Sequence, residues 1–180
     1  MESDFRGDAP SGALILVVED DLDIRAMLVE LLLERGYQTH EATNGSQALA
    51  WLRETPRRPD LILLDLRMPV MDGARFRQEQ QGDAAFSSIP VLLVSAELQG
   101  AEEAEELGVS AFLAKPFDVD ELFSTIAWVL MPGGGDPDGA RKPGALGPRA
   151  DALRGPLPTR SVAALKKPSG SARDRALHQG

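Results

Sequence analysis

The 180-residue sequence contains no cysteine, which excludes disulfides, thiolate zinc sites and cysteine nucleophiles. Its apolar runs are far too short to span a bilayer, and the mixed-charge N-terminus lacks the hydrophobic region of a secretory signal. We therefore expect a cytoplasmic protein with no membrane association. A glycine-rich turn is also missing after the first apolar run, where Glu19-Asp20-Asp21 stands instead, and this argues against a dinucleotide-binding enzyme.

Aromatic side chains are absent from residues 131–180, which hold 9 of the 17 glycines and 7 of the 13 prolines. Such a segment cannot bury enough apolar surface to offset the entropy of ordering, so we predict a disordered tail. The tail carries 9 Lys and Arg against 4 Asp and Glu, whereas residues 1–130 carry 10 against 24. The predicted organisation is a flexible N-terminus at 1–12, one acidic domain at 13–130 and a basic tail at 131–180.

The tail could be an effector that binds nucleic acid. Its basic residues are scattered and it offers no aromatic ring for base stacking, so we expect a solvated extension instead. Salt-sensitive binding by residues 131–180 alone would support the nucleic-acid alternative.

Within the domain, short apolar runs alternate with stretches of helical periodicity. The runs predict strands buried on both faces, and the periodic stretches predict helices that follow them. Strands are expected at 14–18, 37–42, 61–64, 89–94 and 111–114, and helices at 24–35, 46–54, 74–81, 97–107 and from 118 onward. The last helix opens with Asp118 and Glu121, a pair typical of a capping box. Five strands alternating with five helices predict an α/β fold with a doubly wound parallel sheet.

Polar side chains follow these strands at their carboxyl ends, where open α/β sheets bind ligands. The first strand is followed by the acidic run 19–21, the third ends at Asp65, the fourth at Ser95 and the fifth at Lys115. Clustered carboxylates repel one another unless a cation neutralises them, and Mg²⁺ prefers such oxygen ligands. The pattern predicts a Mg²⁺ site beside a phosphorylatable aspartate, with Lys115 and Ser95 available to the phosphoryl oxygens.

The chain resembles the receiver domain of two-component response regulators from Leu14 to Leu130. The matching features occur in the family's order and with similar spacing. They are Asp20-Asp21, Asp65 followed by Met68-Pro69 and Asp72-Gly73, Ser95-Ala96, and Lys115-Pro116-Phe117. The resemblance implies a flavodoxin-like (βα)5 receiver fold with strand order 2-1-3-4-5, in which Lys115-Pro116 is a candidate for a cis peptide bond.

The same resemblance implies roles for individual residues. Asp65 would accept a phosphoryl group from a phosphohistidine, Lys115 would pair with the phosphoryl oxygens, and Ser95 would hydrogen-bond to them. Phe112 matches the aromatic residue whose rotamer follows that hydroxyl. The Mg²⁺ ligands would be Asp21 directly, Asp20 mainly through water, Asp65, and the backbone carbonyl of Arg67.

The implied partners are a sensor histidine kinase or histidine phosphotransfer protein, and a downstream protein target. Phosphorylation adds charge and acceptors, and reorientation of Ser95 and Phe112 would remodel the face formed by the fourth helix, fifth strand and fifth helix. A homodimer through that face is one possible output. The chain would be a stand-alone phospho-acceptor signalling domain rather than an enzyme, because no output domain is recognisable in the tail.

Other interpretations of these residues remain. Asp20 or Asp21 could cap a helix, which is compatible with metal binding. A Mg²⁺-dependent phosphatase with Asp65 as its nucleophile is an alternative function. Such phosphatases usually carry a second aspartate two residues after the nucleophile, where this chain has Arg67, so the sequence argues against it. Arg67 could instead reach the phosphoryl group and change its lifetime, and His40 is expected to be a strand-surface residue without a ligand role.

Overall fold

A computed structural model describes residues 12–96 and 100–132, with the backbone alone at 100–102. The predicted segments 1–12 and 131–180 lie outside these residues except for Gly12, Met131 and Pro132. None of the helices in this part of the chain is long and apolar enough to cross a membrane.

Five strands form one parallel sheet in the order β2-β1-β3-β4-β5, as expected. The strands are β1 (Leu14–Val18), β2 (Gln38–Ala42), β3 (Leu61–Asp65), β4 (Val91–Ser95) and β5 (Ala111–Ala114). β1, β3 and β4 are buried along their whole length, which explains why they are apolar up to the terminal Asp65 of β3 and Ser95 of β4.

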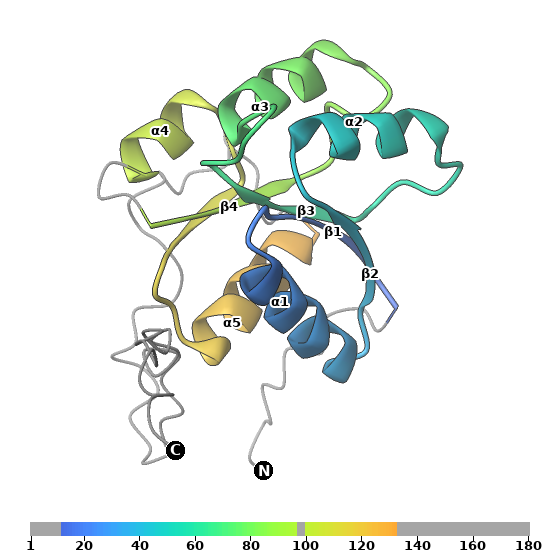
Figure 1. Cartoon of the computed structure of the whole chain (residues 1–180). Coiled ribbons are helices and arrows are strands. Elements are labelled where there is room, and N and C mark those ends of the chain that lie inside the picture. The colour runs from blue at the N-terminus through green and yellow to red at the C-terminus, as the bar shows by residue number, and fades with distance from the viewer. Residues whose placement is uncertain (1–11, 97–99, 133–180) are drawn as a thin grey trace, which may run out of the picture.

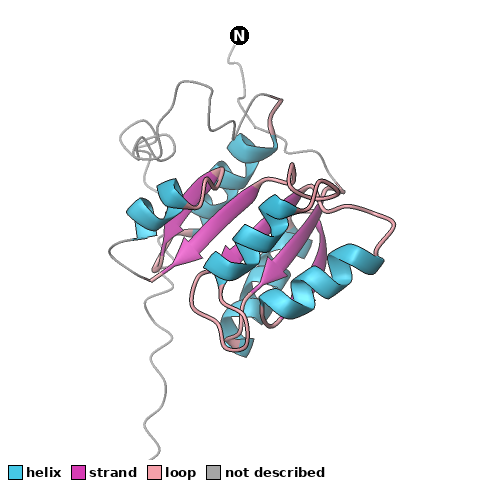
Figure 2. Cartoon of the chain, turned by 90° about the horizontal axis from the view of Figure 1, so that it is seen from above, coloured by secondary structure: helices cyan, strands magenta, loops and turns pink. Residues whose placement is uncertain are grey.

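Helices cover both faces of the sheet (Figures 1 and 2). Figure 1 shows α2, α3 and α4 on one side and α1 and α5 on the other. The helices are α1 (Leu22–Glu34), α2 (Gly45–Glu54), α3 (Gly73–Gly82), α4 (Gly100–Glu106) and α5 (Val119–Leu130). Two hydrophobic cores follow from this arrangement, one on each face, and Phe76 and Phe86 are the largest fully buried side chains of the first.

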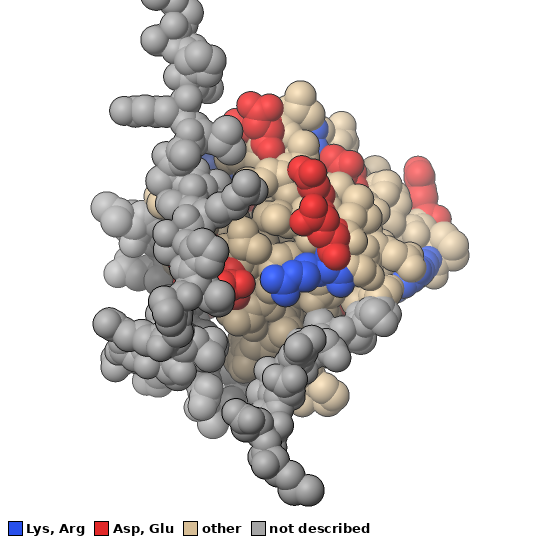
Figure 3. Space-filling view, turned by 90° about the horizontal axis from the view of Figure 1, so that it is seen from below, with Lys and Arg blue, Asp and Glu red and all other residues tan. Residues whose placement is uncertain are grey.

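The second core is closed by contacts between the ends of α1 and α5. Tyr37 stacks on Phe123 with ring centroids 6.3 Å apart, and the Arg35 guanidinium lies 4.3 Å from the centre of the Phe123 ring. Arg35 also approaches Asp120 at 3.9 Å. Figure 3 shows acidic and basic side chains next to one another on the face of the molecule that is seen from below.

Some details differ from the sequence prediction. The fourth helix begins at Gly100, and residues 97–99, which were predicted to be helical, lie outside the described residues. Asp118 occupies the N-cap of α5, but its side chain makes no capping hydrogen bond, so the predicted capping box was wrong. The Lys115-Pro116 peptide bond is cis, as the family resemblance implied.

Candidate functional site

The parallel sheet brings the predicted polar residues to one edge. Glu19 follows β1, Asp65 and Ser95 are the last residues of β3 and β4, and Lys115 follows β5. In the sheet β3 lies between β1 and β4, so Asp65 has the acidic turn on one side and Ser95 on the other. The site is therefore assembled from four strand ends that are distant in sequence.

Three carboxylates converge at this edge. Glu19, Asp20 and Asp65 each offer an oxygen, and these oxygens all lie within 4.8 Å of one another. Glu19 is only 3% exposed and Asp65 is 9% exposed, whereas Asp20 is open to solvent. An all-oxygen donor set with one solvent-facing side suits a hard cation such as Mg²⁺, which retains several water ligands. The residues present thus fit the metal that the sequence predicts.

Lys115 supplies positive charge within this group. Its Nζ donates to Glu19 Oε2 at 2.7 Å and to Asp65 Oδ1 at 3.1 Å. The side chains of all three residues are largely buried, with exposed fractions of 16% for Lys115, 4% for Glu19 and 11% for Asp65. Two buried carboxylates would repel strongly without this ammonium group, so Lys115 partly neutralises them.

The pKa values of these groups reflect burial and their mutual charges. Burial raises the pKa of both Glu19 and Asp65, because it disfavours the ionised form more than the Lys115 contact restores it. Burial lowers the pKa of Lys115, but its hydrogen bonds and the charges of the two carboxylates outweigh burial and raise that pKa overall. Lys115 consequently keeps its proton more strongly than a lysine in water does. The carboxylates of Glu19 and Asp65 are easier to protonate than carboxylates in water.

Asp21 caps a helix, which is the alternative role that the sequence allowed, and it is not part of the converging acidic group. Its Oδ1 accepts hydrogen bonds from the amides of Asp23 at 2.9 Å and Ile24 at 3.1 Å, so it caps the N-terminus of α1. The acidic group at the sheet edge contains Glu19 and Asp20 instead of Asp20 and Asp21. Glu19 was missed because three acidic residues stand in a row, and their sequence does not show which ones turn inward.

The loop after β3 runs close to Asp65. Gly73, the first residue of α3, donates its amide hydrogen to the carbonyl of Leu66 at 2.9 Å. A Cβ at Gly73 would lie only 2.4 Å from the Asp65 carbonyl oxygen, so glycine permits this close approach. Val70 in the same loop has a φ of 70°, which is strained for a β-branched residue.

Ser95 is the last residue of β4, and Phe112 lies in β5. Ser95 is 1% exposed, and its carbonyl accepts a hydrogen bond from the Lys115 amide at 2.8 Å. Phe112 is buried in the core on the side of α2, α3 and α4. Their roles in a switch stay predictions.

Arg67 and His40 make contacts that sequence alone did not indicate. The Arg67 guanidinium approaches Glu103 of α4 at 3.4 Å, with 62% of its side chain exposed. His40 stacks on Trp51 at 4.1 Å between ring centroids, consistent with its predicted place on a strand surface. The predicted contribution of the Arg67 backbone carbonyl to a metal site stays a prediction.

The fold and this arrangement of carboxylates and lysine define the class of protein. A sequence profile of the response regulator receiver domain matches residues 15–127, and the chain belongs to this family. It is therefore a receiver domain of the two-component type, which is a signalling domain.

Individual relatives agree with this assignment. The chain is 42% identical over 110 residues to sporulation initiation phosphotransferase F of Bacillus subtilis (strain 168), covering 60% of this chain and 86% of that protein. It is 32% identical to protein PilH of Pseudomonas aeruginosa, covering 66% of this chain and 98% of PilH. Other relatives are much longer: at 36% identity, the match spans 23% of regulatory protein AtoC of Escherichia coli (strain K12).

Solved structures show the same fold. The chemotaxis response regulator CheY4 of Vibrio cholerae aligns with a TM-score of 0.59 and 31% identity, covering 64% of this chain and 96% of that one. A signal receiver domain of a histidine kinase from Syntrophus aciditrophicus aligns with a TM-score of 0.61 and 34% identity, covering 66% and 90%.

Proposed function

We propose that this receiver accepts a phosphoryl group on Asp65 from a phosphohistidine of a sensor histidine kinase or phosphotransfer protein, in a Mg²⁺-dependent reaction. The main support is the convergence of Glu19, Asp20 and Asp65 around the ammonium group of Lys115. The similarity to sporulation initiation phosphotransferase F and PilH supports a stand-alone receiver that signals through a partner protein.

In the proposed reaction, an Asp65 carboxylate oxygen attacks the phosphorus atom and forms a P–O bond. The P–N bond to the donor histidine breaks, and its electron pair stays on the imidazole, which takes up a proton. Lys115 already contacts Asp65 and would pair with the phosphoryl oxygens. Ser95, at the end of the neighbouring strand, would donate its hydroxyl hydrogen to one of those oxygens.

Mg²⁺ would be held by Glu19, Asp20, Asp65 and the backbone carbonyl of Arg67, and would supply positive charge to the transferred group. This set replaces the sequence-based choice of Asp21, whose carboxylate caps α1. Glu19 and Asp20 stay charged in this scheme, because metal ligation requires the deprotonated carboxylate.

The output of the proposed switch is the face of α4, β5 and α5. Phe112 belongs to β5. The loop after β3 contacts α4 through the ion pair between Arg67 and Glu103. Movement of Ser95 toward the phosphoryl group would alter the packing around Phe112 and thereby this face. A downstream protein, or a second copy of the chain, would bind there.

The test is incubation with Mg²⁺ and a small-molecule phosphodonor, read by intact mass, for wild type and Asp65→Asn. We expect one acid-stable, base-labile phosphoryl group on wild type and none on the variant. Equal labelling of both would contradict the assignment of Asp65. The same assay with a partner kinase covers the case in which small donors react too slowly.

A matched pair of variants tests the acidic ligands. Glu19→Gln removes a charge from the converging group, and we expect it to raise the Mg²⁺ concentration needed for half-maximal labelling about tenfold or more. Asp21→Asn keeps a good N-cap for α1, since Asn caps as well as Asp, and should leave that concentration nearly unchanged. The reverse result would restore Asp21 as a ligand.

A further inference from the structure

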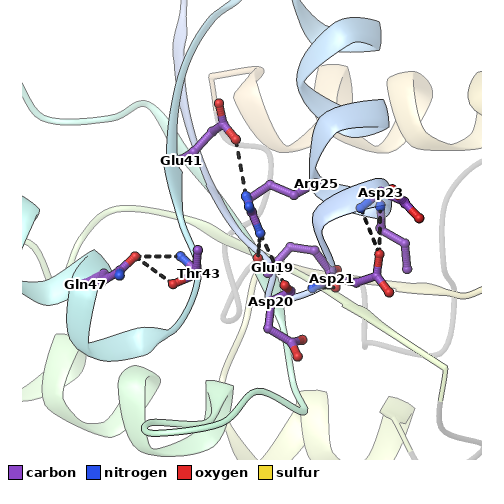
Figure 4. A network of polar contacts seen from close by, with 9 residues as sticks. Glu19, Asp20, Asp21, Asp23, Arg25, Glu41, Thr43 and Gln47 are labelled. Carbon is purple, nitrogen blue, oxygen red and sulfur yellow. Dashed lines mark hydrogen bonds and ion pairs between the residues drawn. The ribbon is translucent and has the colours of Figure 1, made fainter.

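Arg25 makes contacts that its sequence position did not suggest. Arg25 lies in the first turn and a half of α1, and only 8% of its surface is exposed to solvent. Its Nη1 donates to the backbone carbonyl of Glu19 at 2.8 Å and to that of Asp20 at 3.3 Å. Its Nε donates to Glu41 Oε2 of β2 at 3.2 Å. Figure 4 shows the guanidinium between Glu41 and the acidic turn.

These contacts hold the main chain where it leaves the sheet. The Glu19 amide still pairs with the carbonyl of Ala42 in β2 at 3.1 Å, so its nitrogen side is fixed by the sheet. Its carbonyl side, and that of Asp20, are fixed by Arg25. Glu19 is thus held on both sides and Asp20 through its carbonyl, while the contacts of Arg25 leave their carboxylates directed to the site.

The converging carboxylates require such support. Like charges within 4.8 Å of one another repel, and a free turn would relax by moving the Asp20 carboxylate away from those of Glu19 and Asp65. Groups behind a metal site that fix its ligands commonly change metal affinity by about 10-fold to 100-fold when they are removed. Glu41 in turn holds Arg25, with half of its own side chain exposed.

We propose that Arg25 is a positioning residue for the acidic site: by holding the Glu19 and Asp20 carbonyls, it keeps their carboxylates in register with Asp65. This inference rests on the proposed Mg²⁺-dependent function. It predicts that Arg25 strengthens Mg²⁺ binding, although its own positive charge, acting alone, would weaken it. Geometry and charge therefore make opposite predictions.

Arg77 provides a matched control. It is buried to the same degree, at 7% exposed, and also donates to backbone carbonyls, those of Leu107 at 3.1 Å and Gly108 at 2.6 Å. These carbonyls precede β5, at the opposite edge of the sheet from the acidic site. Loss of Arg77 should reduce stability without a specific effect on the metal.

The experiment measures Mg²⁺ affinity of the unphosphorylated protein by amide chemical shifts during titration with Mg²⁺ alone. For Arg25→Met we expect a dissociation constant about tenfold higher than wild type, and for Arg77→Met a value within about twofold. Arg25→Lys retains the charge but not the forked donors, so it should lie between wild type and Arg25→Met. Hydrogen exchange of the Asp21 amide in metal-free Arg25→Met should be faster than in wild type.

Unchanged or tighter Mg²⁺ binding by Arg25→Met would overturn the proposal, as would Arg25→Lys behaving like wild type. If Arg25→Met does not fold, Glu41→Ala decides, because it removes the exposed support of Arg25 and should weaken Mg²⁺ binding in the same direction. Binding by Glu41→Ala equal to wild type would then count against the proposal. A wild-type protein that binds no Mg²⁺ would reject the proposed function itself, whereas equal binding by wild type and Arg25→Met would reject only the role of Arg25.

Discussion

Substitution of Gly73 by alanine tests how closely α3 approaches Asp65, the proposed phosphorylation site. The new Cβ would lie 2.4 Å from the Asp65 carbonyl oxygen and 3.0 Å from the Leu66 Cα. Ordinary contact begins near 3.4 Å, so the backbone must move by about 1 Å. Both contacts are main-chain atoms at the end of β3, so no flexible side chain can absorb the displacement.

Two opposing effects determine how much Gly73→Ala changes the free energy of unfolding. Overpacking of this kind costs about 1–3 kcal/mol, while replacing glycine by alanine in a helix gains about 0.5–1 kcal/mol. We expect a net loss of about 1–2 kcal/mol in the free energy of unfolding, which lowers Tm by about 3–8 °C. Since the displaced atoms belong to Asp65 and Leu66, phosphoryl labelling should also slow by about tenfold to hundredfold.

Gly82, at the other end of α3, is the control. A Cβ at Gly82 meets nothing within 4 Å, so Gly82→Ala should be neutral or stabilise by up to about 1 kcal/mol and leave labelling unchanged. Urea or thermal unfolding and the mass assay measure both variants. If Gly73→Ala matched Gly82→Ala in stability and labelling, the close approach would have no functional meaning.

Three further predictions concern the same edge of the sheet. Val70→Gly should stabilise the protein by about 0.5–1 kcal/mol, because relief of the strained φ exceeds the entropic cost of glycine, and a lower urea midpoint would contradict this. Lys115→Met should destabilise by about 3 kcal/mol by leaving two buried carboxylates unpaired, and added Mg²⁺ should restore part of the loss; a variant Tm insensitive to Mg²⁺ would argue against a metal site. Because the folded-state pKa values of Glu19 and Asp65 are raised above those of the unfolded chain, acidification from pH 7 should weaken Mg²⁺ binding and stabilise the metal-free protein. The stabilising contribution is complete below the unfolded pKa and is lost as pH rises through the folded one. A loss of Mg²⁺ affinity that begins only where ordinary carboxylic acids become protonated would refute the raised pKa values.

The architecture could be predicted because burial is visible in the sequence. The run Leu61–Leu64 has no polar residue because β3 is covered on both faces, and the same holds for β1 and β4. Gly36, with its φ of 83°, follows the C-cap residue of α1, a position at which glycine is favoured. Helix boundaries shifted by a residue or more, since capping depends on local hydrogen bonds that residue types only favour.

The candidate site was only partly predictable. Asp65 and Lys115 follow apolar strands directly, so their positions at the sheet edge were clear from the sequence. The contact of Lys115 with Glu19 joins residues 96 positions apart, and no local pattern indicates it. The supporting contacts of Arg25 with the Glu19 and Asp20 carbonyls span only a few residues, but residue types do not show which backbone carbonyls a helical arginine will reach.

The sequence by itself determined the fold, the family and the position of Asp65 at the end of a buried strand, because buried strands and their polar ends are local features. Only the tertiary structure decided how three consecutive acidic residues divide their roles. The Glu19 amide bonds to β2, and Arg25 donates a hydrogen bond to the Glu19 carbonyl; together these bonds direct Glu19 and Asp20 toward Asp65. The Asp21 carboxylate instead caps the N-terminus of α1. Side-chain direction at the end of a strand depends on backbone hydrogen bonds to other elements, and these form only once the chain has folded.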